Sequence, residues 1–161
     1  ASGKSMLAQA VRTRLLARGT ACALLDGDEV RAALVPRPGY STDDRGAFYE
    51  TLIHLAALLA RQDLVVLVAA TAHRRRYRGA ARQRSGRFVE VYLRATREEC
   101  AQRDKKGLYA RARAGEIQGL PGADLDYEPP ERPEVIASGG EDAQAVEEIV
   151  DRLDRFTRAD R

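Results

Sequence analysis

The sequence predicts an α/β fold in which a parallel sheet carries helices on both faces. Short apolar runs alternate with segments whose apolar residues recur at spacings of three and four, as strands and amphipathic helices do. One run, residues 64–70, is apolar throughout, which is typical of a parallel strand buried on both faces. Such an alternation requires crossover connections and gives three layers with the sheet in the middle.

The elements are predicted in a regular order along the chain. Strands are expected at residues 21–25, 64–70, 88–93 and 135–137, and helices near 44–62, 74–85, 96–104 and 142–157. Ser41 or Thr42 is expected to cap the helix near 44–62. A first helix is indicated by apolar residues at helical spacing, namely Met6, Leu7, Ala10, Val11, Leu15 and Leu16. The 161 residues are expected to form one domain, 1–161.

The chain opens with the end of a phosphate-binding loop. A complete loop reads G-x-x-x-x-G-K-[ST] after a buried strand, and Gly3, Lys4 and Ser5 supply its last letters. The N–H groups and dipole of a helix that starts here favour phosphate, with Lys4 facing the β- and γ-phosphates and Ser5 holding Mg²⁺. The remaining letters would lie upstream of residue 1, so we expect an N-terminally truncated domain that lacks its first strand.

Two carboxylates follow the first visible strand, at Asp26 and Asp28. Beside a phosphate-binding loop, one can order Mg²⁺ and the other can accept the proton of an attacking hydroxyl; the residues leave open which does which. Arg31 could hold an anionic acceptor. A turn with a helix-capping Asp explains the same residues without any function.

Two further features allow more than one interpretation. His73 follows the long apolar strand and could bind substrate or catalyse, or it could cap or pack a loop, whereas His54 is expected to be structural. The arginines at 74–76, 78 and 82 form either a solvated helix face, a substrate-facing anion site or a nucleic-acid patch. The net charge of +3 and pI of about 9.1 fit each of the three.

Several classes are disfavoured by composition. The sequence has no run of eighteen apolar residues, so no membrane span is predicted, and no spacing of Cys, His and Asp suggests a zinc site. Cys22 and Cys100 are expected to be small core residues rather than disulfide partners, which indicates a reducing, cytoplasmic compartment.

Four motifs together resemble those of the adenylylsulfate (APS) kinases, over residues 2 to about 135. The family pattern GxxxSGKST corresponds to residues 2–6, with Met6 in place of Thr, and LDGDxxR matches residues 25–31. The pattern GFSxxDR matches residues 39–45, with Tyr40 for Phe. The lid pattern RDxKGLYxxARxGEIxGxxGxDxxYEPPxxPE matches residues 103–134, and this long match is the most specific.

Members of this family use ATP and Mg²⁺ to phosphorylate the 3′-hydroxyl of adenylyl sulfate. The resemblance implies a P-loop NTPase fold with a lid over about 103–130, a cytoplasmic enzyme of sulfate assimilation, a homodimer, and neither nucleic-acid nor membrane binding. It implies a catalytic set of Lys4, Asp26 and Asp28, with Ser5 and Asp26 as metal ligands. The implied ATP-binding residues are Ser2, Gly3, Lys4, Ser5, Arg103 and Lys106. The implied acceptor-binding residues are Arg31, Tyr40, Arg45, Phe48, Thr71, His73 and Leu108.

The chain departs from the family pattern on the acceptor side. Where the family has Asn-Ile-Arg-Arg, which contacts the acceptor, residues 48–51 read Phe-Tyr-Glu-Thr, and Ile-Ser-Pro-Tyr-Arg becomes Thr-Ala-His-Arg-Arg at 71–75. An acidic Glu50 should disfavour a dianionic acceptor, although His73 and Arg74 could restore positive charge from another side. Two alternatives follow: a kinase of this fold with another alcohol as acceptor, and a nucleotide-binding domain that no longer catalyses.

Overall fold

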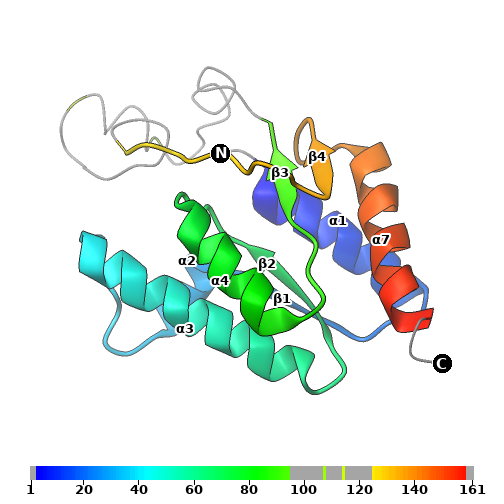
Figure 1. The fold of residues 1–161 in the computed structure, drawn as a ribbon, viewed down its shortest axis with the longest axis horizontal. Coiled ribbons are helices and arrows are strands. Elements are labelled where there is room, and N and C mark those ends of the chain that lie inside the picture. The colour runs from blue at the N-terminus through cyan, green and yellow to red at the C-terminus, as the bar shows by residue number, and fades with distance from the viewer. Residues whose placement is uncertain (1–2, 95–106, 108–113, 115–124, 159–161) are drawn as a thin grey trace.

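A computed structural model describes residues 3–94, 107, 114 and 125–158 of the chain, and Figure 1 shows their arrangement. The predicted helix at 96–104 and most of the predicted lid lie outside these residues. In chain order the elements are α1 (Lys4–Ala17), β1 (Cys22–Asp26), α2 (Gly27–Ala33), α3 (Thr42–Ala60), β2 (Val65–Ala69), α4 (Arg75–Ser85), β3 (Val91–Leu93), β4 (Val135–Ala137) and α7 (Ala143–Arg158).

The strands form two parallel pairs. β1 pairs with β2 from Cys22 opposite Val65 to Asp26 opposite Ala69, and β3 pairs with β4. No strand of the described residues joins the two pairs. Because Asp26 and Ala69 are partners at the last position of their strands, the loops after β1 and β2 leave from the same edge.

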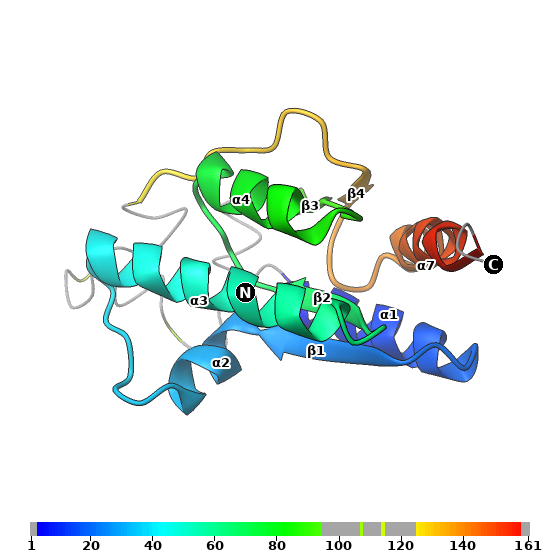
Figure 2. The same cartoon turned by 60° about the horizontal axis from the view of Figure 1, so that its bottom comes forward.

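Helices cover both faces of the β1–β2 pair, as predicted. α1 packs on β1 and β2 from one side and against α7, whereas α3 packs on the same strands from the other side and against α4. Figures 1 and 2 show these two helix pairs, with the strands between them. The fold is therefore the layered α/β arrangement that the alternation of patterns indicates.

Two hydrophobic clusters hold the layers together. The first joins α1, β4 and α7 and contains Leu7, Val11, Leu15, Val135, Ala137, Ala145, Val146, Ile149 and Val150. The second joins α3 and α4 and contains Phe48, Tyr49, Leu52 and Tyr77. The predicted inner face of α1 is confirmed at its centre, whereas Met6 and Leu16 at its edges are about half exposed.

The start of α3 confirms Ser41 as the capping residue. The Ser41 hydroxyl accepts a hydrogen bond from the backbone N–H of Asp44 (3.1 Å), and the Asp44 carboxylate accepts one from the Ser41 N–H (3.3 Å). This reciprocal capping box satisfies two of the backbone donors that a helix start leaves without partners. Thr42 is instead the first helical residue.

Two predictions about elements are wrong in detail, and one short helix was not predicted. The strand expected at 88–93 begins only at Val91, because the backbone N–H of Glu90 donates to the Glu134 carboxylate (2.7 Å). The expected burial of 64–70 on both faces fails at Val68, which is 44% exposed because β2 has a strand partner on one edge only among the described residues. The short helix α2 is not predicted by apolar spacing; it forms directly after β1.

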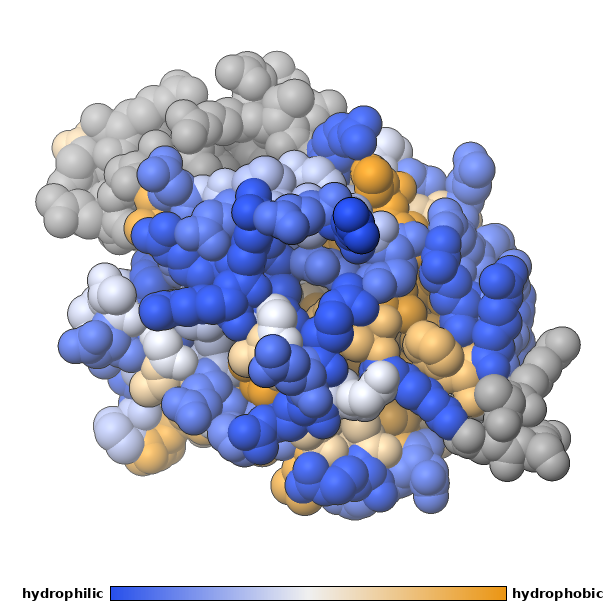
Figure 3. Space-filling view, viewed as in Figure 1, coloured by the Kyte–Doolittle hydropathy of each residue, from blue (hydrophilic) through white to orange (hydrophobic). Residues whose placement is uncertain are grey.

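The surface seen from the side of Figure 1 is mostly hydrophilic, with apolar surface showing mainly between α4 and α7 (Figure 3). Among the described helices, none combines the length and the apolar character needed to cross a bilayer.

Candidate active site

The start of α1 lies in backbone contact with the turn that follows β4. Gly3 precedes the helix with φ of 89°, a left-handed conformation that glycine adopts without the steric cost of a side chain. A Cβ atom added to Gly140 would lie 2.8 Å from the carbonyl oxygen of Gly3, so the two glycines allow a close approach. No side chain caps α1 and its first turn carries no acid, which suits a helix start that receives an anion.

Asp26 links the start of α1 to Asp28, the other carboxylate of the pair. It is the N-cap of α2: one carboxylate oxygen accepts from the backbone N–H of Asp28 (2.9 Å), and the other accepts from the Ser5 hydroxyl. Asp28 stands in the first turn of α2, where the residue is exposed. The structure thus brings Ser5, Asp26 and Asp28 together at the sheet edge, and Asp26 is both a helix cap and a candidate functional residue.

Two buried arginines fix the loop between α2 and α3. Arg31, 5% exposed, donates from its guanidinium to the carbonyls of Pro38 (3.3 Å) and Gly39 (2.5 Å). Arg45, 8% exposed, donates from Nε to the carbonyl of Tyr40 (2.9 Å). These charge-assisted bonds order the loop that carries Tyr40.

An aromatic cluster lies behind this loop. The rings of Tyr49 and Tyr77 stack with centroids 4.4 Å apart, and the His73 ring lies 5.7 Å from that of Tyr77. Phe48 packs edge-on against Tyr49 and lies 3.9 Å below the Arg31 guanidinium carbon. Phe48 and Tyr49 therefore serve as core residues, the role that their helical spacing from Leu52 also favours.

His73 is buried in this cluster. Its side chain is 3% exposed, and its Nδ1 has no hydrogen-bond partner among the described residues. Burial lowers the pKa of His73, the nearby guanidinium groups of Arg45 and Arg74 lower it further, and the Glu128 carboxylate opposes them. His73 is consequently neutral at neutral pH and does not supply the positive charge that its position in the sequence suggested.

The burial of His73 should make stability depend on pH. The unfolded side chain takes up a proton near pH 6.5, whereas the folded one does so only at lower pH, so the free energy of unfolding should fall as the pH drops below 6.5. In thermal unfolding at pH 7.5 and 5.5, the decrease in Tm should be larger for the wild type than for His73→Asn. His54→Gln, at the exposed histidine of α3, should keep the wild-type decrease. An equal decrease in wild type and His73→Asn would contradict this prediction.

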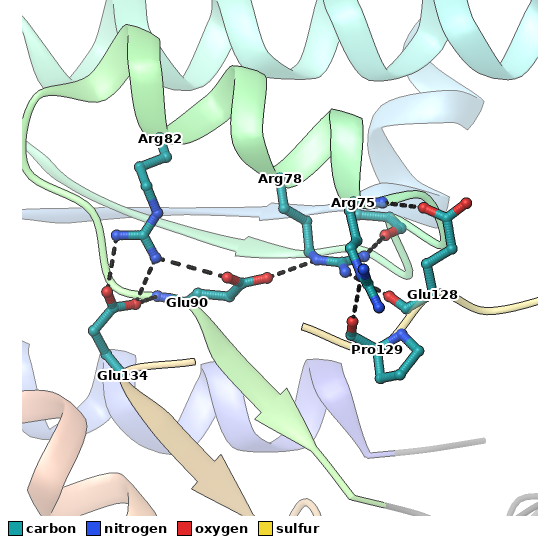
Figure 4. Close-up of polar contacts among 8 residues, drawn as sticks. Arg75, Arg78, Arg82, Glu90, Glu128, Pro129 and Glu134 are labelled. Atoms are coloured by element: carbon teal, nitrogen blue, oxygen red, sulfur yellow. Dashed lines mark hydrogen bonds and ion pairs between the residues drawn. The ribbon is translucent and has the colours of Figure 1, made fainter. Parts of the chain in front are cut away.

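A network of arginines joins α4 to the carboxylates of Glu90 and Glu134 and to the backbone of Glu128, as Figure 4 shows. Arg78 donates to the carbonyls of Ala72 and Glu128 (2.5 Å each) and to the Glu90 carboxylate (2.6 Å). The backbone N–H of Glu128 donates to the carbonyl of His73 (2.8 Å), and that of Ala72 donates to the Tyr49 hydroxyl (2.9 Å). These bonds hold Ala72 at a φ of 41°, which is uncommon for a residue with a side chain.

The same network gives carboxylate partners to most of the arginines at 74–76, 78 and 82. The Glu128 carboxylate accepts from Arg74 (2.8 Å) and from the backbone N–H of Arg75 (2.7 Å), and Arg82 forms two bonds of 2.8 Å with Glu134. The pKa of Glu134 is lowered chiefly by this bond from Arg82. Since carboxylates of the chain itself pair with most of these arginines, the interpretation as a nucleic-acid patch is weakened.

A cavity of about 270 Å³ opens between the starts of α3 and α4. Among the predicted acceptor residues, Tyr40, Arg45 and His73 line it, whereas Arg31, Phe48 and Thr71 do not. Arg76 and Tyr77 also line it; the sequence did not single out either residue, although Arg76 belongs to the basic run for which a substrate-facing anion site was one interpretation. Their position just after a strand end was a usable signal, but the basic run around them had several interpretations. Ser2, Arg103, Lys106 and Leu108 lie outside the described residues.

By its fold and by the groups gathered at one sheet edge, this is an α/β protein of the P-loop class, suited to phosphate chemistry. A family profile described as Adenylylsulphate kinase matches residues 1–138. An adenylyl-sulfate kinase of Picosynechococcus sp. is 41% identical over 152 residues, which are 94% of this chain and 85% of that protein. One from Vibrio vulnificus is 42% identical over 154 residues, covering 94% of this chain and 73% of the relative.

A solved structure agrees with these matches. The Mycobacterium tuberculosis APS kinase in complex with AMPPNP and APS superimposes with a TM-score of 0.88 at 37% identity, covering 95% of this chain and 91% of that one. The chain belongs to the adenylylsulfate kinase family.

Proposed function

We propose that the protein transfers the γ-phosphoryl group of ATP to the 3′-hydroxyl of adenylyl sulfate, giving ADP and 3′-phosphoadenylyl sulfate. The observation that carries this proposal is the contact of Ser5 with Asp26 beside Asp28, at the same edge as the cavity. Phosphoryl transfer depends mainly on positioning and on stabilising charge, so a phosphate site and a hydroxyl-orienting carboxylate at one edge suit it. Membership of the adenylylsulfate kinase family supports the choice of acceptor.

On the donor side, Gly3, Lys4 and Ser5, together with Ser2, are proposed to hold the ATP phosphates. The open start of α1 supports this, because its N–H groups have no side-chain cap to satisfy them. Arg103 and Lys106 are proposed to contact the nucleotide from the lid, over about 103–130, within a single domain of residues 1–161.

The residues present fit a magnesium ion. A hydroxyl and a carboxylate are the oxygen donors that Mg²⁺ prefers, and those of Ser5 and Asp26 already touch. When bound, Mg²⁺ would neutralise charge on the β- and γ-phosphates. We assign the ion to Ser5 and Asp26, which leaves Asp28 to accept the hydroxyl proton of the acceptor.

On the acceptor side, Tyr40, Arg45 and His73 are proposed to contact adenylyl sulfate directly, since they line the cavity. Arg31 and Phe48 are proposed to act through the Tyr40 loop, because Arg31 bonds its carbonyls and stacks on Phe48. Thr71 and Leu108 remain predictions from the resemblance. A different alcohol acceptor, and a domain without catalysis, are not favoured by relatives about 40% identical over most of the chain. A homodimer and a cytoplasmic location stay proposals.

The test is a coupled assay of ADP release by the full-length protein in Mg²⁺-ATP, with and without adenylyl sulfate. The proposal expects release that depends on the acceptor, with 3′-phosphoadenylyl sulfate identified by mass. A protein that binds ATP but shows no stimulation by adenylyl sulfate would contradict the proposal.

A further inference from the structure

Among the described residues, the positive charge at the cavity between α3 and α4 comes from arginines. Its wall combines the rings of Tyr40 and Tyr77 with the side chains of Arg45, Arg74 and Arg76. A wall of aromatic rings and guanidinium groups suits a ligand that has both a flat ring and negative charge, as a nucleotide does. Some of these charges are already matched within the protein and so are not available to such a ligand.

Two of the charged or titratable side chains in this wall are already accounted for. Arg74 forms an ion pair with Glu128 (2.8 Å), so its charge is matched within the protein. His73 is held neutral by burial and by the neighbouring guanidinium groups, which lower its pKa. Arg45 is buried and donates from Nε to the loop carbonyl of Tyr40, which orients it.

Arg76 differs from these residues. Its guanidinium donates to the Tyr77 hydroxyl (3.4 Å) and lies 5.1 Å from the centre of the Tyr77 ring, and both contacts are to a neutral side chain. Among the described residues no carboxylate lies within ion-pair distance of it, whereas Arg74 and Arg75 on either side of the α4 start have such partners. Arg76 is therefore held at the cavity wall with a charge that the described chain does not neutralise.

On the opposite side of the cavity, α3 carries no arginine or lysine other than Arg45 that could replace Arg76 in binding an anion. Phe48 and Tyr49 point into the second hydrophobic cluster, Glu50 is acidic, and the Thr51 hydroxyl donates to the carbonyl of Ala47 (2.9 Å). The Asp44 carboxylate is engaged by the Ser41 N–H and hydroxyl in the capping box. The electrostatic recognition of an anion in this cavity consequently depends on the α4 side.

We propose that Arg76 is a specificity-determining residue that binds the phosphosulfate charge of the acceptor from the start of α4, with Tyr77 supporting its guanidinium. The proposal rests on the proposed function. It assigns the acceptor's negative charge to a residue at the start of α4, because α3 carries no arginine or lysine other than Arg45.

Steady-state kinetics of the full-length protein test this assignment. Arg76→Ala should raise KM for adenylyl sulfate about tenfold, the effect of losing one charge-assisted hydrogen bond, while kcat and KM for ATP stay within about twofold. Arg76→Lys keeps the charge without the planar fork, so it should give an intermediate KM. Added salt should raise KM for adenylyl sulfate less steeply in Arg76→Ala than in wild type.

A matched variant separates this role from a general loss of positive charge. Arg84→Ala removes an exposed arginine of the same helix that does not line the cavity. It should leave KM for adenylyl sulfate within about threefold of wild type. The assignment is overturned if wild type is active and Arg76→Ala has an unchanged KM, or if Arg84→Ala raises KM as much as Arg76→Ala. Absence of acceptor-dependent ADP release in wild type instead overturns the proposed function, and the assignment falls with it.

Discussion

Replacing Asp28 with Asn is expected to lower kcat by about two to four orders of magnitude, the usual contribution of a general base. The amide keeps the size of the carboxylate but cannot accept the proton of the acceptor hydroxyl. KM for ATP should change little, because the phosphates are assigned to the start of α1. Single-turnover and steady-state ADP release, with ATP binding measured separately, provide the check.

The neighbouring carboxylate supplies the control for this variant. Glu29 is also exposed and also stands in the first turn of α2, so Glu29→Gln changes the helix-end charge equally. Its turnover should stay close to wild type. If Asp28→Asn keeps wild-type turnover, Asp28 is not the base. Asp26→Asn then becomes the variant to examine, although it also weakens the cap of α2 and the contact with Ser5.

The donor side of the site could be predicted from sequence because its parts are local. Gly3, Lys4 and Ser5 adjoin in the chain, and Asp26 follows a strand whose parallel neighbour fixes the edge it reaches. The contact of Ser5 with Asp26 follows from the packing of α1 on β1. Short-range motifs and strand order therefore suffice to bring these groups together.

The acceptor side could not be predicted in the same way because its properties depend on distant groups. The charge state of His73 is set by burial and by Arg45, which belongs to another helix. The start of β3 is set by the Glu134 carboxylate, 44 residues from Glu90 in the chain. The basic run looked uniform in sequence, yet Arg82 faces a carboxylate and Arg76 faces the cavity. Such differences arise from tertiary partners that periodicity does not reveal.

A second large effect is expected at Gly140, which lies beside the start of α1. In Gly140→Ala the new methyl group would lie 2.8 Å from the Gly3 carbonyl oxygen and 3.0 Å from the Gly3 Cα, and these backbone atoms cannot move aside cheaply. The start of α1 must shift, so we expect KM for ATP to rise at least tenfold, since a displacement of about 1 Å can cost a hundredfold in rate. Overpacking of this kind should also cost about 1–3 kcal/mol of stability, read from denaturant unfolding.

Gly79→Ala makes the same chemical change in open space. Gly79 lies in α4, and a Cβ atom there would meet nothing within 4 Å. Alanine should therefore stabilise the helix by about 0.5–1 kcal/mol and leave KM for ATP unchanged. The contrast isolates the steric effect, since Gly140, unlike Gly3, has no positive φ to add backbone strain. If Gly140→Ala bound ATP as wild type does, the turn after β4 would have room to retreat, and the close approach of Gly3 and Gly140 would not be what positions the phosphate-binding end of α1.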